Sequence, residues 1–100
     1  MATLTAQRTV IDAGIRLDAD RAPGLRREIE TVFADDQTPV IDVRSVEHMD
    51  MAGLSALAWL LVLCRRRDAG AYLLGPLPEP VSRLLDLTTF DRFFQIRLGP

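Results

Sequence analysis

Hydrophobic and polar positions divide the chain into short runs typical of strands and longer runs with helical spacing. The β-branched residues of segment 3–17 predict one or two strands, with Gly14 as a break or bulge. Short apolar runs predict further strands at residues 40–43, 71–74 and 93–97. Because helical segments separate these strands, the pattern predicts an α/β sheet covered by helices.

The helical segments begin and end at recognisable signals. Residues 22–34 predict a surface helix with a proline in its first turn. Residues 53–67 predict the most apolar helix, with Asp50 as its N-cap and Gly70 as its stop. A third helix is predicted after Pro78 and Pro80, where the side chains that share one face are Val81, Leu84 and Leu85.

The second helix has two apolar faces instead of one. At 100° per residue, the face assigned to the core carries Leu54, Leu57, Ala58, Leu61 and Cys64. The opposite side carries an apolar patch with a polar edge, formed by Ser55, Ala56, Trp59, Val62, Leu63 and Arg66. Such a patch is typical of a docking surface. The alternative is that the third helix or the chain ends cover Trp59 and Leu63.

Length, charge and cysteine content restrict the setting. A chain of 100 residues fits one domain over residues 1–100, and a net charge of −2 gives no general attraction to nucleic acid or anionic lipid. The longest apolar stretch, residues 51–64, is shorter than the roughly 20 residues that span a bilayer. Cys64 is the only cysteine, and no secretory signal is visible, so we expect a cytoplasmic protein that is not embedded in a membrane.

Residues with catalytic or metal-binding potential are few. His48 and Cys64 are single residues of their type, which excludes a zinc cluster or a Cys-His nucleophile. The carboxylates of Asp42, Glu47 and Asp50 lack a nucleophile or an acid-base partner, and no glycine-rich phosphate loop is present. We therefore expect no catalytic residue, metal or cofactor, and a protein that is not an enzyme. The remaining candidate is a docking loop at residues 50–54.

Three stretches of the sequence resemble the STAS domain as found in bacterial anti-sigma-factor antagonists. Residues 40–54, VIDVRSVEHMDMAGL, are similar to the family's signature, in which a V-x-D-L strand leads into D-S-[ST/A]-G-L at a helix start. Residues 14–23, GIRLDADRAP, resemble its G-E-L-D stretch with one extra residue. Residues 84–94, LLDLTTFDRFF, are similar to its closing pattern. The similarity covers nearly the whole chain.

The resemblance implies both a fold and a function. The fold is a STAS-like mixed sheet of four to five strands covered by three to four helices. The function is a partner switch: the domain binds an anti-sigma factor that is also a serine kinase and so frees a sigma factor, until phosphorylation of a loop hydroxyl breaks the complex. The alternative is a STAS scaffold subunit of another complex, such as a lipid-transport ABC ATPase. Self-association is left open.

The sequence departs from the family at the switch itself. Met51 and Ala52 occupy the two hydroxyl positions, with Ala52 at the phosphosite, so we expect no phosphorylation there. Ser45 and Ser55 are the nearest serines, and Ser55 lies inside the predicted helix. The loop shape should persist, and the residues expected to contact a partner are Asp50, Met51, Ala52, Gly53, Ser55, Ala56, Trp59 and Leu63.

Overall fold

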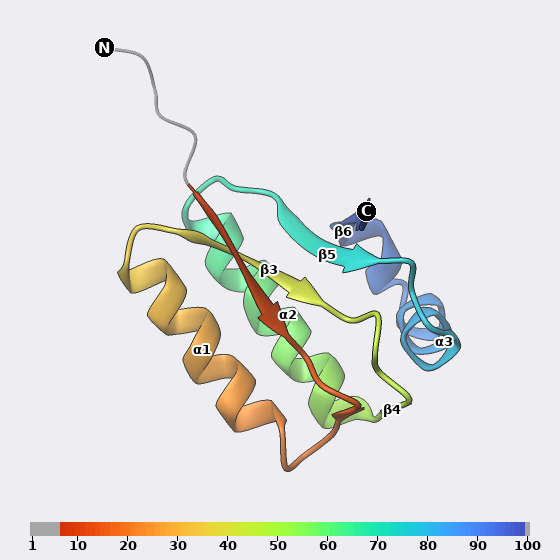
Figure 1. The fold of residues 1–100 in the computed structure, drawn as a ribbon. Helices are drawn as coiled ribbons and strands as arrows, with labels where there is room; N and C mark the ends of the chain where they lie inside the picture. Colours follow the sequence, from red (N-terminus) through yellow and green to blue (C-terminus); the bar gives the residue numbers. More distant parts are fainter. Residues whose placement is uncertain (1–6, 100) are drawn as a thin grey trace.

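A computed structural model describes residues 7–99 and contains a four-stranded sheet (Figure 1). The strand order is β1-β3-β5-β6, and the strands are β1 (Arg8–Asp12), β3 (Thr38–Asp42), β5 (Ala71–Gly75) and β6 (Phe94–Leu98). Each pairing between neighbours is parallel. Parallel neighbours require crossover connections, and a helical segment supplies each of them.

A second, two-stranded ladder lies outside the main sheet. It joins β2 (Arg16–Leu17) to β4 (His48–Met49), also in parallel. The ladder continues into the next helix, because the Asp50 amide donates to the Leu17 carbonyl oxygen at 3.3 Å. Two segments far apart in the sequence thereby fix the entry of the chain into that helix.

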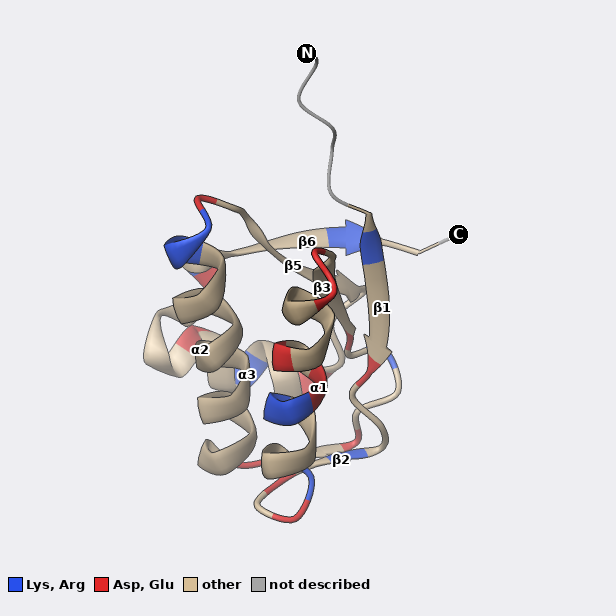
Figure 2. Cartoon of the chain, turned by 90° about the vertical axis from the view of Figure 1, so that its left-hand side faces the viewer, with Lys and Arg blue, Asp and Glu red and all other residues tan. Residues whose placement is uncertain are grey.

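Two long helices cover one face of the sheet. α1 (Ala22–Ala34) and α2 (Met51–Arg66) lie side by side on that face in both views (Figures 1 and 2). α3 (Glu79–Thr88) and a short 3₁₀ helix, η1 (Phe90–Phe93), connect β5 to β6.

The core lies between the sheet and the helices. Ile41 and Leu73 are fully buried at the centre of the sheet. The helices contribute the fully buried side chains Leu25, Ile29, Leu57, Leu60 and Leu85. Burial of such side chains contributes roughly 1.5–3 kcal/mol each, which makes this interface the main stabilising element of the domain.

The structure confirms the predicted α/β class and the number of helices. The first helix has the predicted bounds, whereas α2 begins at Met51 and not at Gly53 because Asp50 caps it directly. The expected mixed sheet is not seen among residues 7–99, where the strand pairings are all parallel. The part of the first predicted strand before residue 7 lies outside the described residues. Within residues 7–99, no helix has the length and hydropathy required to span a membrane.

Candidate functional site

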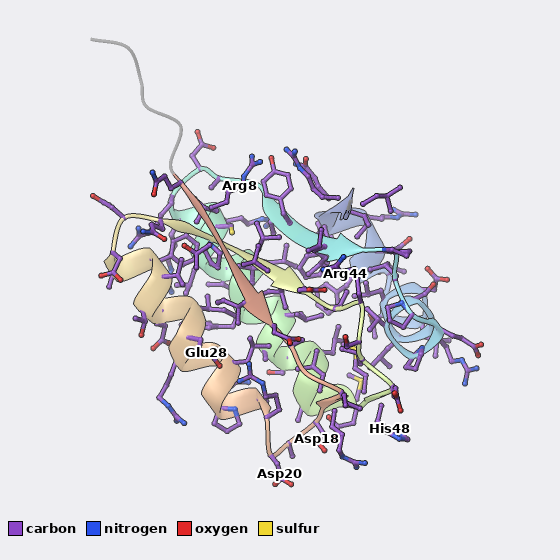
Figure 3. All side chains as sticks on the ribbon, viewed as in Figure 1. Arg8, Asp18, Asp20, Glu28, Arg44 and His48 are labelled. Carbon is purple, nitrogen blue, oxygen red and sulfur yellow. The ribbon has the colours of Figure 1, made fainter. Side chains whose placement is uncertain are left out.

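The site begins where β3 ends. Both carboxylate oxygens of Asp42 accept hydrogen bonds from the Arg44 guanidinium at 3.0 Å, and Oδ1 also accepts from the Arg44 amide. These hydrogen bonds lower the pKa of Asp42 and raise the pKa of Arg44. Figure 3 shows Arg44 close to the end of β3. The pair therefore holds the first turn of the loop that leads to β4, and it is a structural feature of the loop.

Asp50 caps α2, as the sequence predicts. Its backbone is extended, and its Oδ1 accepts from the Gly53 amide at 3.0 Å. Its carbonyl oxygen accepts from the Leu54 amide at 3.0 Å. The carboxylate also lies at the positive end of the helix dipole. Asp50 thus fixes the shape of the loop at the point where α2 starts.

Replacement of Asp50 by alanine is expected to destabilise the domain by about 1 kcal/mol, because one amide of the first turn loses its acceptor. Asp50→Asn keeps an oxygen in the same place and should cost only a few tenths of a kcal/mol. Urea unfolding of the three proteins measures the difference. An equal loss in both variants would show that the negative charge, and not the side-chain oxygen, stabilises the helix start.

Gly53 is a packing residue of the loop. A Cβ at this position would lie 2.0 Å from the Leu17 carbonyl oxygen and 2.8 Å from its Cγ. The first turn of α2 therefore packs directly on the backbone of β2, and Leu54 follows into the core. Gly53 permits the close approach that the sequence suggested, but it is buried and offers no side chain to a partner.

Met51 and Ala52 differ in their exposure to solvent. The Met51 side chain is 60% exposed, whereas Ala52 is half-buried and packs against the core. Beside them, a groove of about 320 Å³ joins the loop to α3, and its lining comprises Met49, Glu79, Pro80, Arg83 and Leu84. The accessible surface around the start of α2 therefore extends onto the first turns of α3.

A stripe of side chains on α2 faces away from the core. We call it the α2 surface, and its residues are Met51, Ser55, Ala58, Trp59 and Val62. Ser55 Oγ accepts a hydrogen bond from Arg26 Nη2, and Trp59 Nε1 donates to Glu30 Oε2 at 2.9 Å. Trp59 is half-buried, so it is neither a freely exposed anchor nor a core residue.

Two grooves flank the α2 surface. The first, about 420 Å³, lies toward α1 and is lined by Arg26, Glu30, Ser55, Ala58, Trp59 and Val62. The second, about 280 Å³, lies toward η1 and is lined by Ala58, Leu61, Val62, Arg65, Phe90 and Phe93. Ala58 and Val62 border both grooves, and Val62 is 40% exposed. The grooves and the ridge between them form one mainly apolar surface with charged edges.

The predicted division of α2 into two faces is partly wrong. Ala56, expected in the patch, is fully buried, and so is Leu60, which was assigned to neither face. Ala58 and Leu61, expected in the core, line the grooves. Apolar residues surround most of α2, so the periodicity alone does not distinguish its buried side. Leu63 is half-buried and packs against the core.

Sequence reasoning missed the aromatic contribution of η1. Phe90 and Phe93 form an edge-to-face pair with centroids 6.2 Å apart, and the Arg65 guanidinium lies 5.6 Å from the Phe93 ring centre. Phe93 was assigned to the last strand, yet it lies in η1 and is 47% exposed. The cluster of aromatic residues in segment 90–94 is the signal that could have identified this edge.

Other candidate chemistry is not assembled in the described part of the chain. Cys64 is buried, and burial raises the pKa of its thiol to about 11, so it is a core residue with little thiolate at neutral pH. Between residues 7 and 99, no group of three or more His, Cys, Asp and Glu side chains is placed to hold a metal ion.

Comparison with known proteins identifies relatives over almost the full chain. The family model of the STAS domain matches residues 3–99. The unphosphorylated form of the anti-sigma factor antagonist SpoIIAA aligns with a TM-score of 0.68 at 18% identity, covering 99% of this chain and 84% of that one. The phosphorylated form of SpoIIAA from Bacillus aligns with a TM-score of 0.71 at 16% identity, covering 96% and 87%.

A third solved structure shares the fold as well. It is a protein from Thermotoga maritima assigned as an anti-sigma factor antagonist, with a TM-score of 0.78 at 18% identity. The alignment covers 98% of this chain and 84% of that chain. At these identities, the three structures establish a shared fold.

Proposed function

The chain belongs to the STAS domain family, and from this premise we propose that it is a protein-binding regulatory module that docks an anti-sigma factor through the α2 surface. Its fold is that of the anti-sigma factor antagonists, which supports this class of function over others. In this proposal the protein is not an enzyme, works in the cytoplasm, and releases a sigma factor by occupying the anti-sigma factor. The partner is proposed to be of the serine-kinase type.

The observation that carries the proposal is the capped and closely packed loop that leads into the α2 surface. Asp50 and Gly53 fix the start of α2 from two sides, through the cap and through contact with Leu17. Met51 then projects into solvent at the end of an apolar stripe that reaches Val62. A preformed apolar surface loses little conformational entropy when a partner covers it, which favours tight binding.

Partner contacts are proposed for the accessible members of the predicted set. These are Asp50, Met51, Ala52, Ser55, Trp59 and Leu63, to which we add Ala58, Val62 and Phe93 from the grooves. Gly53 and Ala56 are left out of the proposed contacts, because both are buried. The proposed interface therefore differs from the predicted one mainly on the η1 side.

We further propose that binding does not depend on phosphorylation at the usual loop position. SpoIIAA is known in an unphosphorylated and a phosphorylated form, whereas Met51 and Ala52 have no hydroxyl to accept phosphate. Ser55 lies three residues further into α2 than Ala52, and its hydroxyl accepts a hydrogen bond from Arg26, so it does not occupy the usual position at the helix start. Ser45 is exposed in the turn after β3, away from the start of α2.

Replacement of Ala52 by serine is expected to create the missing switch. After incubation with the partner kinase and ATP, Ala52→Ser should gain one phosphate, and its complex should weaken at least about 10-fold through desolvation and repulsion of the added charge. The wild-type chain is the matched control and should gain none. Intact-mass spectrometry and co-purification measure both effects. Phosphate on wild-type Ser45 or Ser55 would contradict the proposal.

The partner class is tested separately from the switch. Affinity purification from the native cell should recover a protein with a serine-kinase ATPase domain, without the sigma factor that the proposed binding displaces. Recovery of a transport ATPase with its permease would instead favour the scaffold role. A Val62→Asp variant, which alters the α2 surface, should fail to recover the partner in either case.

A further inference from the structure

The carboxyl end of α2 carries three consecutive arginines, Arg65 to Arg67, and Figure 2 shows basic residues gathered there. Arg67 serves the fold, because its guanidinium donates to the Phe33 carbonyl oxygen at 2.9 Å and lies 4.6 Å from the Phe33 ring centre. This contact joins the end of α2 to the end of α1. A positive charge at a helix end also complements the helix dipole. The dipole does not account for the positions of Arg65 and Arg66 beside the two grooves.

Arg65 and Arg66 flank the apolar ridge of the α2 surface at its far end. Val62 precedes them by three and four residues, so the three side chains are neighbours on the helix. The Arg65 guanidinium lies 5.6 Å from the Phe93 ring centre, and Arg65 lines the groove toward η1. The Arg66 guanidinium lies 5.7 Å from the ring centre of Trp59, which lines the groove toward α1. Each groove therefore has a cation beside it at this end of α2.

Neither cation has a carboxylate partner in the described part of the chain. The ion pairs found between residues 7 and 99 involve other arginines. Residues 1–6 contain no Asp or Glu that could neutralise them. η1 adds one charge of each sign, at Asp91 and Arg92, which leaves the local balance positive. Both Arg65 and Arg66 are exposed, and a guanidinium binds an external carboxylate through two N–H donors at once.

The groove toward η1 combines this charge with an apolar interior. Its volume is about 280 Å³, and apart from Arg65 its lining is entirely apolar. Val62 and Phe93, on its two sides, are 40% and 47% exposed. An apolar pocket that holds a partner side chain, with charges at its rim, is a common arrangement for the centre of a protein interface. The complementary ligand is therefore an apolar side chain with carboxylates next to it.

We propose that the partner presents an acidic segment to this end of α2, with an apolar side chain in the groove toward η1 and carboxylates on Arg65 and Arg66. This proposal rests on the proposed function, because the segment is assigned to the anti-sigma factor that docks on the α2 surface. The groove supplies affinity, and the two cations select an acidic partner and speed its association.

The charges disfavour two other occupants of the groove. A second copy of this chain, bound through the same surface, would bring the unpaired arginines of both copies together. A nucleic acid would meet a chain with a net charge of −2, which gives no general attraction to a phosphate backbone. An acidic protein segment meets neither obstacle.

Charge reversal tests the role of the cations in binding the anti-sigma factor recovered from the native cell. Arg65→Glu should raise the dissociation constant at least about 10-fold, because the carboxylates of the partner are then repelled. Arg65→Gln removes the charge without reversing it and should have a smaller effect in the same direction. Wild-type binding should also weaken more between low and high salt than Arg65→Gln binding does. Isothermal titration measures all of these affinities.

Arg27→Glu is the matched control for charge reversal. It changes the net charge by the same amount, at an exposed position on α1 that lines neither groove beside α2. Its affinity should stay close to that of the wild-type chain. Thermal unfolding of each variant should accompany the titrations, because a carboxylate near the end of α2 opposes the helix dipole. Arg65→Gln keeps the test decisive if Arg65→Glu does not fold.

A cross-link tests directly whether a carboxylate lies at Arg65. The chain contains no lysine, so Arg65→Lys introduces its only side-chain amine. A carbodiimide joins an amine to a carboxylate that is in direct contact with it. Arg65→Lys should therefore become bonded to an Asp or Glu of the anti-sigma factor, which peptide mass spectrometry identifies. Arg27→Lys is the control and should give no such bond.

Three results would overturn the acidic segment and leave the proposed function intact. The first is Arg65→Glu binding with the wild-type dissociation constant. The second is cross-linking of Arg65→Lys to the anti-sigma factor no more than Arg27→Lys does. The third is a cross-link between two copies of the chain, which would assign the groove to self-association. A wild-type chain that binds no anti-sigma factor would instead overturn the proposed function, and the acidic segment with it.

Discussion

Replacement of Gly53 by alanine is expected to destabilise the domain by about 3 kcal/mol, near the upper end of the cost of overpacking. The new methyl group would lie 2.0 Å from the Leu17 carbonyl oxygen, and that atom belongs to the backbone of β2. Relief requires α2 to move away from the β2–β4 ladder. For a domain of this size, a loss of about 3 kcal/mol lowers Tm by roughly 12–24 °C, which thermal unfolding by circular dichroism measures.

Gly24→Ala is the matched control for this prediction. Gly24 also lies in a helix, but a Cβ there would meet side-chain atoms and no backbone, namely the guanidinium groups of Arg21 at 3.3 Å and of Arg27 at 3.9 Å. Alanine is a better helix former than glycine by up to about 1 kcal/mol, so the control should be neutral or stabilising. If Gly53→Ala kept the wild-type Tm, the inference that α2 packs closely on the backbone of β2 at this residue would be wrong.

Val62→Asp is expected to weaken the complex with the anti-sigma factor by about 100-fold, or about 2.7 kcal/mol, while changing Tm little. Val62 is 40% exposed and borders both grooves, so a partner that covers the α2 surface must bury it. A carboxylate in that position would be desolvated without a counter-ion. Isothermal titration of the purified partner measures the affinity.

Leu87→Asp is the control for the binding measurement. Leu87 is an exposed apolar residue on α3 and lines neither groove beside α2. The Leu87→Asp variant should bind the anti-sigma factor with the same affinity as the wild-type chain. Equal weakening by both substitutions would indicate a general effect of added negative charge, and unchanged binding by Val62→Asp would exclude the α2 surface from the interface.

Local signals predicted most of the fold from the sequence. The bounds of α1 follow from Pro23 in the first turn and a single apolar stripe, which leave one consistent assignment. The cap at Asp50 was equally predictable, because its bond to Gly53 spans only one turn. The parallel arrangement within residues 7–99 depends on pairing between distant segments, and the sequence does not encode it locally.

The orientation of α2 was harder to predict for a physical reason. Its apolar residues surround most of the helix, so the periodicity does not define which side packs inward. In the structure Ala56 and Leu60 are buried, and Ala58 is half-exposed. The role of η1 depends on a further long-range contact, in which Phe93 faces Arg65 across the groove. Only the tertiary arrangement places these residues together.

The most direct test of the proposed function is a calorimetric titration of the wild-type chain into its serine-kinase anti-sigma factor, once with ADP and once with ATP and Mg²⁺. The absence of a hydroxyl at Met51 and Ala52 predicts binding with the same dissociation constant in both nucleotides. Loss of binding after incubation with ATP, together with phosphate on the chain, would contradict the proposal. A chain that binds the anti-sigma factor neither with ADP nor with ATP would contradict it as well.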